Sequence, residues 1–178
     1  MPTAEAGQAL APRRERARAA TIEEIKATAL DLMREQHTTD VRFTDIARVM
    51  GMTPPALYRY FADRDELLTE LITDAYDELG RQVAASRDQA PESDIGGRWL
   101  AAAQAYRSWA RQQPEQFSLI LGMPVPGYAA EEEGPTTEAA KRAMSQLSAL
   151  FTDAAEKGQL GRQKIFDGLL QRLDAQAS

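Results

Sequence analysis

Hydrophobic residues recur at intervals of three and four along most of the chain, and no stretch alternates between apolar and polar positions for long. The first spacing gathers apolar side chains on one face of an α-helix, whereas alternation is typical of a half-buried strand. The sequence therefore predicts an all-α fold. Glycine and proline clusters separate expected helices at about 13–36, 43–50, 54–61, 64–87, 95–112, 114–121, 136–157 and 163–175.

These helices are expected to form two domains. Residues 1–12, rich in Ala, Gly and Pro, are expected to be a disordered tail. A compact helix-turn-helix domain is expected at 13–62. A helical regulatory and dimerisation domain is expected at 63–178, with the helix at 63–87 as the stalk that connects the two. The loop at 122–135 holds three prolines and three glycines, and it is either a moving flap or a plain connector.

A short stretch at 50–67, "MGMTPPALYRYFADRDEL", places two prolines directly before an aromatic helical run. A residue that precedes proline is pushed toward extended geometry, which suits Thr53 as the N-cap of a helix. Pro54 and Pro55 then occupy the first two helical positions, whose amides have no intrahelical partner. Gly51 suits the positive φ that closes the preceding helix. Together these features predict a helix-turn-helix whose second helix has a stiffened leading end.

In a helix-turn-helix, that leading end is the part that enters the DNA major groove. Arg59 is placed to reach a base edge or a phosphate, and Tyr58 and Tyr60 offer hydroxyls to backbone phosphates. Arg42, at the start of the preceding helix, can hold a flanking phosphate. The expected DNA-binding residues are Arg42, Thr44, Thr53, Pro54, Pro55, Ala56, Tyr58, Arg59, Tyr60 and Arg64. The alternative is an ordinary helical hairpin with packed tyrosines and solvated arginines.

The segment "FTDIARVMGMTPPALYRYFADRDELL" strongly resembles the helix-turn-helix of TetR-type transcriptional repressors. The Ile-Ala pair, the Gly turn, the Leu-Tyr-x-(His/Tyr)-Phe ending and the acidic-Leu-Leu run carry the resemblance, which covers about residues 13–85. It implies a dimer whose two heads read a near-palindromic operator. It also implies that Thr44, Thr53, Pro54, Pro55, Ala56, Tyr58, Arg59, Tyr60 and Arg64 lie at DNA-contact positions. One departure is Arg42, where the family usually has a capping Ser or Thr, so weaker capping is expected there.

After residue 87, "AYRSWARQQPEQFSLILG" looks like the start of the helical regulatory domain of such repressors. In these proteins a bound small molecule moves the connecting helix and spreads or closes the DNA-reading heads. The expected lining for a hydrophobic ligand is Trp99, Tyr106, Trp109, Phe117, Ile120, Leu121, Met123, Tyr128, Met144, Leu147 and Phe151. Plain core packing is the alternative for each of them. Many relatives have a further apolar helix before the last one, so this domain is either shortened or has an unusual dimer interface.

The charge distribution is uneven. The net charge is −6, yet residues 1–64 hold 10 Lys and Arg against 9 Asp and Glu, whereas the rest holds 11 against 18. Arg13, Arg14, Arg16 and Arg18 form a cluster that suits a basic contact surface, although a solvated arginine-rich tail would look the same. The chain lacks cysteine, a secretory signal and any apolar run of about 20 residues, so it is expected to be cytoplasmic without a membrane partner.

Enzymatic chemistry is not expected. His37 is the only histidine and lies in a polar loop, so no Ser-His-Asp arrangement can be built around it. The glutamate run at 131–133 lacks the spacing of a cation site, and no glycine-rich phosphate loop occurs. No cofactor or metal is expected. The alternatives to a ligand-responsive repressor are a module that docks a protein partner without reading DNA, and an enzyme acting on a hydrophobic small molecule.

Overall fold

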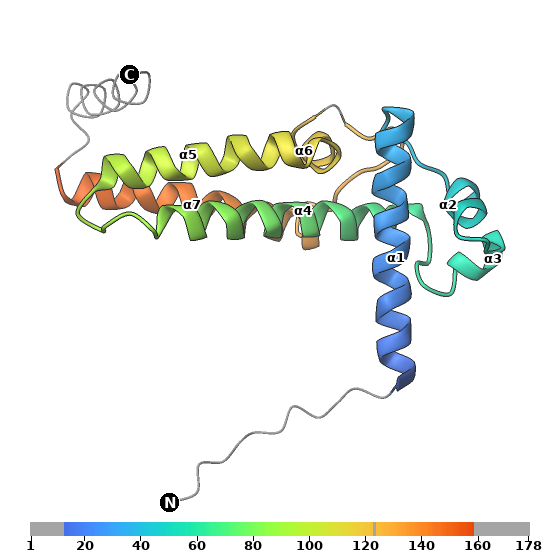
Figure 1. Ribbon diagram of the computed structural model, residues 1–178. Coiled ribbons are helices and arrows are strands. Elements are labelled where there is room, and N and C mark those ends of the chain that lie inside the picture. Colours follow the sequence, from blue (N-terminus) through green and yellow to red (C-terminus); the bar gives the residue numbers. More distant parts are fainter. Residues whose placement is uncertain (1–12, 123, 159–178) are drawn as a thin grey trace, which may run out of the picture. The chain divides into compact units, whose positions relative to one another are not determined.

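The computed structural model describes residues 13–122 and 124–158 of the 178-residue chain. The described residues contain helices and no strand, as the predicted all-α fold requires. Figure 1 shows α1 (Arg13–Gln36), α2 (Phe43–Val49), α3 (Pro54–Leu57), α4 (Arg64–Arg87), α5 (Ile95–Gln112), α6 (Pro114–Leu121) and α7 (Pro135–Glu156). The chain divides into two compact units between Leu67 and Leu68. The predicted disordered tail at 1–12 and the predicted helix at 163–175 lie outside the described residues.

The first unit has a small core built from the facing sides of α1, α2 and α3. Ile25 and Ala29 from α1, Ile46 and Ala47 from α2, and Leu57 from α3 have no solvent exposure. Burying one aliphatic side chain of the size of Ile or Leu stabilises a fold by about 1.5–3 kcal/mol. This core holds one face of the helix-turn-helix and leaves its other face in solvent.

A left-handed residue ends α2 and turns the chain toward α3. Gly51 has φ of 64°, as predicted for the residue that closes this helix. The amide of Met52 donates to the carbonyl of Ala47 at 2.8 Å, and the amide of Gly51 donates to that of Arg48 at 3.3 Å. This pair of bonds is the Schellman motif, which satisfies the last carbonyls of a helix. His37, with φ of 51°, ends α1 by the same geometry.

The recognition helix is shorter than predicted. α3 ends at Leu57, whereas the predicted helix ran through Phe61. The amides of Ala56, Arg59 and Tyr60 donate to carbonyls three residues earlier, so the chain winds in tight turns instead of extending the α-helix. The carbonyl of Leu57 accepts from the amides of both Tyr60 at 2.8 Å and Phe61 at 3.1 Å. Such sharing is common where a helix ends, and the chain continues through Tyr60 as a turn.

Asp63 caps α4 as predicted. Its Oδ1 accepts from the amide of Glu66 at 2.8 Å. The Glu66 carboxylate accepts in return from the amide of Ala62. This reciprocal arrangement is a capping box shifted by one residue at its outer end, and it fixes where the stalk begins.

In the second unit, α4 runs alongside α5 and α7, with α6 at one end of α5 (Figure 1). The fully buried cluster that joins the three long helices is Ala75, Leu79, Val83, Ala102, Trp109 and Leu150. A Cβ atom placed on Gly80 would lie 3.1 Å from the Cα of Ala143, so glycine permits α4 and α7 to approach closely at this point. Arg142 also forms a bidentate ion pair with Asp77, with Nη2 at 2.9 Å from each carboxylate oxygen.

A charged cluster closes one end of this bundle. Arg87 donates to Asp88 through Nε at 2.7 Å and Nη2 at 2.9 Å. Arg98, at the start of α5, adds a bond to Asp88 at 3.0 Å and lies 3.5 Å from Asp153 of α7. The hydrogen bonds from Arg87, joined by those from Arg98, lower the pKa of Asp88 from its ordinary value of 3.8 to about 2.

This cluster predicts a pH dependence of stability. A carboxylate whose pKa is depressed on folding stabilises the fold above its unfolded pKa, and that contribution is lost as pH falls through the folded value. We expect Asp88→Asn to lower the free energy of unfolding at pH 7 by about 1 kcal/mol or less, since Asp88 is half exposed. The difference from wild type should shrink between pH 4 and pH 2, as measured by urea denaturation. Glu133→Gln, at an exposed loop position, should show no such trend.

Candidate functional site

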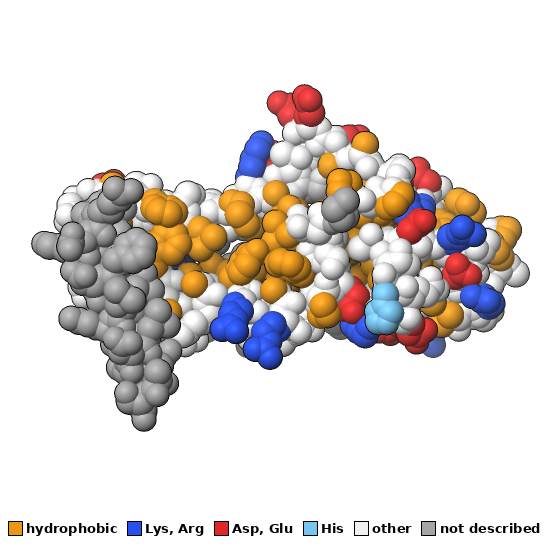
Figure 2. All heavy atoms as spheres, turned by 90° about the horizontal axis from the view of Figure 1, so that it is seen from above, with side chains coloured by type: hydrophobic (Ala, Val, Ile, Leu, Met, Phe, Trp, Pro, Cys, Tyr) orange, Lys and Arg blue, Asp and Glu red, His pale blue; other side chains and the backbone are white. Residues whose placement is uncertain are grey.

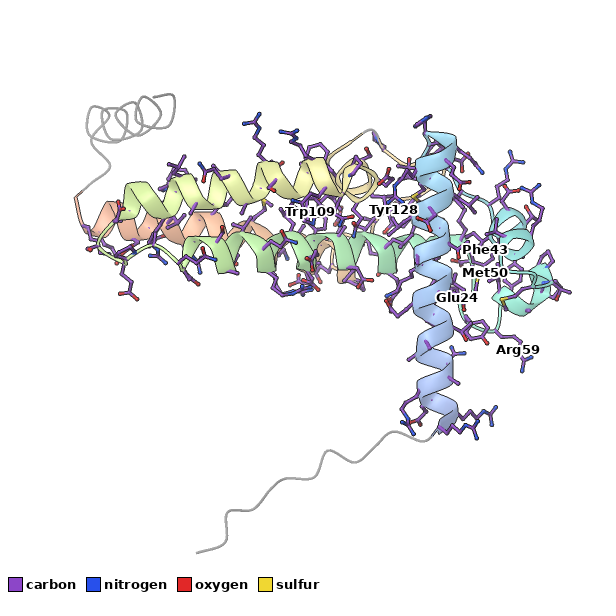
Figure 3. The ribbon with its side chains drawn as sticks, in the orientation of Figure 1. Glu24, Phe43, Met50, Arg59, Trp109 and Tyr128 are labelled. Carbon is purple, nitrogen blue, oxygen red and sulfur yellow. The ribbon has the colours of Figure 1, made fainter. Side chains whose placement is uncertain are left out.

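The outer face of α3 presents a group of exposed side chains. Thr53, Pro54, Pro55, Tyr58 and Arg59 are all exposed, whereas Ala56, also predicted to contact DNA, is half-buried. Tyr58 is 57% exposed, yet its ring centroid lies 5.3 Å from that of Phe43, which limits its movement. Figure 3 shows the Arg59 side chain directed outward from this end of the head. The structure therefore brings most of the predicted contacts onto one surface.

The start of α2 adds two polar side chains. Arg42 occupies the N-cap with φ of −104° and ψ of 144°, and its side chain makes no capping bond, as the sequence predicted. Its backbone carbonyl accepts from the amide of Asp45 at 3.0 Å. Arg42 and Thr44 are both exposed. Thr53 also makes no side-chain cap, because the amide of Ala56 bonds to the Thr53 carbonyl at 2.8 Å instead.

Arg64, also predicted to contact DNA, is bonded within the first unit. Its Nε donates to the carbonyl of Val41 at 3.0 Å, and its Nη2 donates to Asp40 at 2.8 Å. Only 25% of the side chain is exposed. The guanidinium thus fastens the loop before α2 to the start of α4.

Tyr60 and the arginines of α1 form a second feature, which sequence reasoning missed. An open pocket with a volume of about 640 Å³ is lined by Arg14, Glu15, Ala17, Arg18, Thr21, Arg59 and Tyr60. The sequence showed a cluster of positively charged residues here, but it did not show that this cluster contacts the end of α3. The signal lies in the spacing of 14, 17, 18 and 21, which places these residues on one face of a helix.

The predicted ligand-lining residues fall into separate groups. Several belong to the core of the second unit or pack against it: Trp99, Tyr106, Trp109, Phe117, Ile120 and Leu147. Three are substantially exposed, namely Leu121 at 45%, Met144 at 40% and Phe151 at 54%. Met123 lies outside the described residues. The alternative of plain core packing therefore accounts for Trp109, which has no exposure at all.

Two of the predicted residues, Ile120 and Tyr128, line a cavity of about 250 Å³ in the second unit. The cavity lies among α4, α6, the following loop and α7, and its lining is Ile72, Tyr76, Leu119, Ile120, Pro124, Val125, Tyr128, Ala130, Thr136, Thr137 and Ala140. The Tyr76 hydroxyl donates to the carbonyl of Ile120 at 3.0 Å, and the hydroxyls of Tyr128 and Thr69 lie 3.1 Å apart. Burial raises the pKa of Tyr76, with a smaller contribution from Tyr106.

This lining is mostly apolar, with a few hydroxyl groups at its edge (Tyr128 is labelled in Figure 3). Its volume lies below the range of roughly 300–1,000 Å³ that is usual for drug-sized ligands, so it suits a small molecule. Among the described residues, no group of three or more His, Asp or Glu side chains could hold a metal ion. The described helices also include none that is long and apolar enough to cross a membrane.

Comparison with known proteins identifies the family. The profile for bacterial regulatory proteins of the tetR family matches residues 19–71, and that for a tetracyclin repressor-like C-terminal domain matches residues 99–173. The crystal structure of SCO4313, a candidate regulatory protein, is similar, with 36% identity and a TM-score of 0.68 over 86% of this chain and 73% of that one. The chain belongs to the TetR family.

A curated protein and a second solved structure are also similar. The HTH-type transcriptional regulator Rv1816 of Mycobacterium tuberculosis is 39% identical over 112 residues, or 61% of this chain and 48% of that protein. The match thus spans about half the length of such curated relatives. A candidate TetR-family transcription regulator from Shewanella sp. PV-4 shares the fold, with a TM-score of 0.63 at 22% identity over 81% of this chain and 74% of that one.

Membership of the TetR family confirms the resemblance that the helix-turn-helix motif suggested, and with it the all-α architecture with an N-terminal helix-turn-helix. It also places the chain in a family of DNA-binding regulators, which are not enzymes. The TetR-family profile covers α2, α3 and their exposed surface, which makes that surface the first candidate for function.

Proposed function

We propose that this TetR-family chain is a transcriptional repressor that binds a palindromic DNA operator as a homodimer and is released by a small, largely hydrophobic molecule. The observation that carries the proposal is the two-sided character of the helix-turn-helix. Leu57 on its inner side has no exposure, while Thr53, Pro54, Pro55 and Arg59 on its outer side are exposed.

The chemistry of this surface suits duplex DNA. A guanidinium can donate two parallel hydrogen bonds to the O6 and N7 atoms of guanine, and Arg59 offers one at the projecting end of α3. Tyr58 is held against Phe43, so its hydroxyl can meet a phosphate with little loss of side-chain entropy. Arg42 and Thr44 supply further phosphate contacts at the start of α2. Arg64, which is bonded to Asp40, is left out of the proposed contact set.

The homodimer is supported by apolar surface on α7. Met144 and Phe151 are 40% and 54% exposed, and their spacing of seven residues places them on one face of the helix. Figure 2 shows hydrophobic side chains gathered over the second unit on the face seen there. A second copy packed on α7 would cover such side chains and supply the second head that a palindrome needs.

The position of the 250 Å³ cavity beside α4 supports the proposal that a bound effector releases the protein from DNA. Ile72 and Tyr76 of α4 line it, and the same helix begins at Arg64 within the first unit. A ligand that binds one position of α4 more tightly than another shifts DNA affinity by that difference in binding free energy. Bound DNA must then change the ligand affinity by the same factor.

The decisive experiment uses a pool of randomised duplexes, because no operator sequence is needed at the start. Rounds of selection with the full chain are expected to enrich a two-fold symmetric sequence. Arg59→Ala should then weaken binding to that duplex about ten- to a hundredfold, the equivalent of about 1–3 kcal/mol for one bidentate base contact. Fluorescence anisotropy of a labelled duplex measures the change.

Arg111→Ala is the matched control, because it removes one exposed arginine from α5 instead of from the head. It should bind the selected duplex as wild type does. Enrichment of no duplex would instead support the module that docks a protein partner, and equal binding of a selected duplex by Arg59→Ala and wild type would contradict the proposed base contact. Circular dichroism must show that both variants remain folded.

A further inference from the structure

The recognition segment is too short to hold its own conformation. α3 comprises the four residues Pro54–Leu57, and a single helical turn is unstable unless tertiary contacts support it. Its inner side is supported by Leu57, with no exposure, and by Phe61, with 3%. The outer end at Arg59, where the proposed base contact lies, is exposed and needs a support of its own.

Arg18 of α1 supplies that support. Its Nη1 donates to the backbone carbonyl of Arg59 at 2.7 Å, across 41 residues of sequence. The same guanidinium lies 5.3 Å from the centroid of the Tyr60 ring, within range of a cation–π interaction. One side chain therefore contacts two consecutive residues at the end of the recognition segment, and one of these carries the proposed base-reading group.

We infer that Arg18 is a positioning residue of the DNA-reading surface, which fixes the backbone of Arg59 and thereby the direction of its side chain. This inference rests on the proposed function. In this inference Arg18 acts through Arg59 and not through a DNA contact of its own, since its Nη1 bonds to the carbonyl and its guanidinium lies near the aromatic ring. Arg14 lies one turn earlier on the same face of α1 and lines the same open pocket, so it provides a matched comparison.

The first test needs no DNA. Hydrogen exchange of the backbone amides at 53–61 is measured in the free protein by mass spectrometry or NMR. Arg18→Ala should speed exchange there about tenfold, the effect of losing one charged hydrogen bond at a partly exposed site. Arg18→Lys should do nearly the same, because an ammonium lacks the planar face and the fixed donor fork of arginine. Arg14→Ala should leave exchange unchanged. Equal exchange in wild type and both Arg18 variants overturns the inference.

The second test separates positioning from a phosphate contact. We expect Arg18→Ala to lower, by about tenfold, the ratio of the affinity for the selected duplex to the affinity for non-specific DNA. The slope of log affinity against log salt should stay at the wild-type value, whereas removal of one phosphate contact would change it by about 0.9 for each engaged head. A slope that falls by this amount, or an Arg18→Lys variant that binds as wild type does, would overturn the inference. If wild type selects no duplex, the proposed function fails, while the exchange experiment still decides whether Arg18 holds the segment.

Discussion

Raising the salt concentration from 50 to 200 mM is expected to weaken binding of this chain to duplex DNA by about a thousandfold. Each phosphate that a Lys or Arg side chain neutralises releases a condensed counterion, which contributes about 0.9 to the slope of log affinity against log salt. If about three arginines of each head in the proposed dimer neutralise a phosphate, the slope is about −5. A single head would give a slope of about −2.7 and a loss of only about fortyfold. The slope therefore reports the number of engaged heads together with the presence of DNA contacts.

The measurement is a set of anisotropy titrations across that salt range on the selected duplex. Arg42→Ala should reduce the steepness of the slope by about 0.9 for each engaged head, because its exposed side chain is proposed to meet a phosphate. Arg111→Ala removes the same charge from α5 and should leave the slope unchanged. An affinity that hardly varies with salt would contradict a DNA-reading role and favour the docking module.

Trp109→Ala is expected to lower the free energy of unfolding of the second unit by about 3–5 kcal/mol, the usual cost of removing a large aromatic side chain from a core. Trp109 has no solvent exposure, and it packs with Leu79, Val83, Ala102 and Leu150 from three helices. Alanine would leave a cavity at the point where α4, α5 and α7 meet. Such a loss is a large part of the 5–15 kcal/mol that usually stabilises a native protein.

The matched variant is Trp109→Phe. The buried indole nitrogen of Trp109 has no hydrogen-bond partner among the described residues. Phenylalanine removes that unsatisfied donor and keeps most of the aromatic volume, so we expect a loss of about 1.5 kcal/mol or less. Urea denaturation followed by circular dichroism measures both variants without relying on tryptophan emission. A loss below about 1 kcal/mol for the alanine variant would show that this residue does not organise the core.

The helices could be predicted because a helix that buries one face carries hydrophobic residues at intervals of three and four positions. The bounds of α1, α4 and α5 agree with the pattern to the residue. The end of α3 disagreed with the pattern, because the amides of Arg59 and Tyr60 bond three residues back and Arg18 of another helix contacts the segment there. Sequence spacing describes only the residues within one helix, so support from 41 residues away leaves no local signal.

The site was predictable to a different degree in the two units. In the first unit, the helix-turn-helix motif predicted which side of α3 is exposed. The positive charge of Arg64 did not indicate that this residue is bonded to Asp40 and Val41. In the second unit, aromatic richness selected core residues such as Trp109. The cavity beside Tyr76 and Thr136 is lined largely by small, aliphatic and hydroxyl side chains from several elements, and such residues carry no periodic signal.

The placement of the two tryptophans bears on how an effector could be found by spectroscopy. Trp109 is sealed from water, while Trp99 is half-buried with its ring edge-on to Phe151 at 4.5 Å. A dissolved quencher such as acrylamide should reach Trp99 first. Neither indole lines the cavity beside Tyr76 and Tyr128. Compound libraries scored by tryptophan emission would thus pass over molecules that enter there, and tyrosine emission or a shift in melting temperature is the readout that would register them.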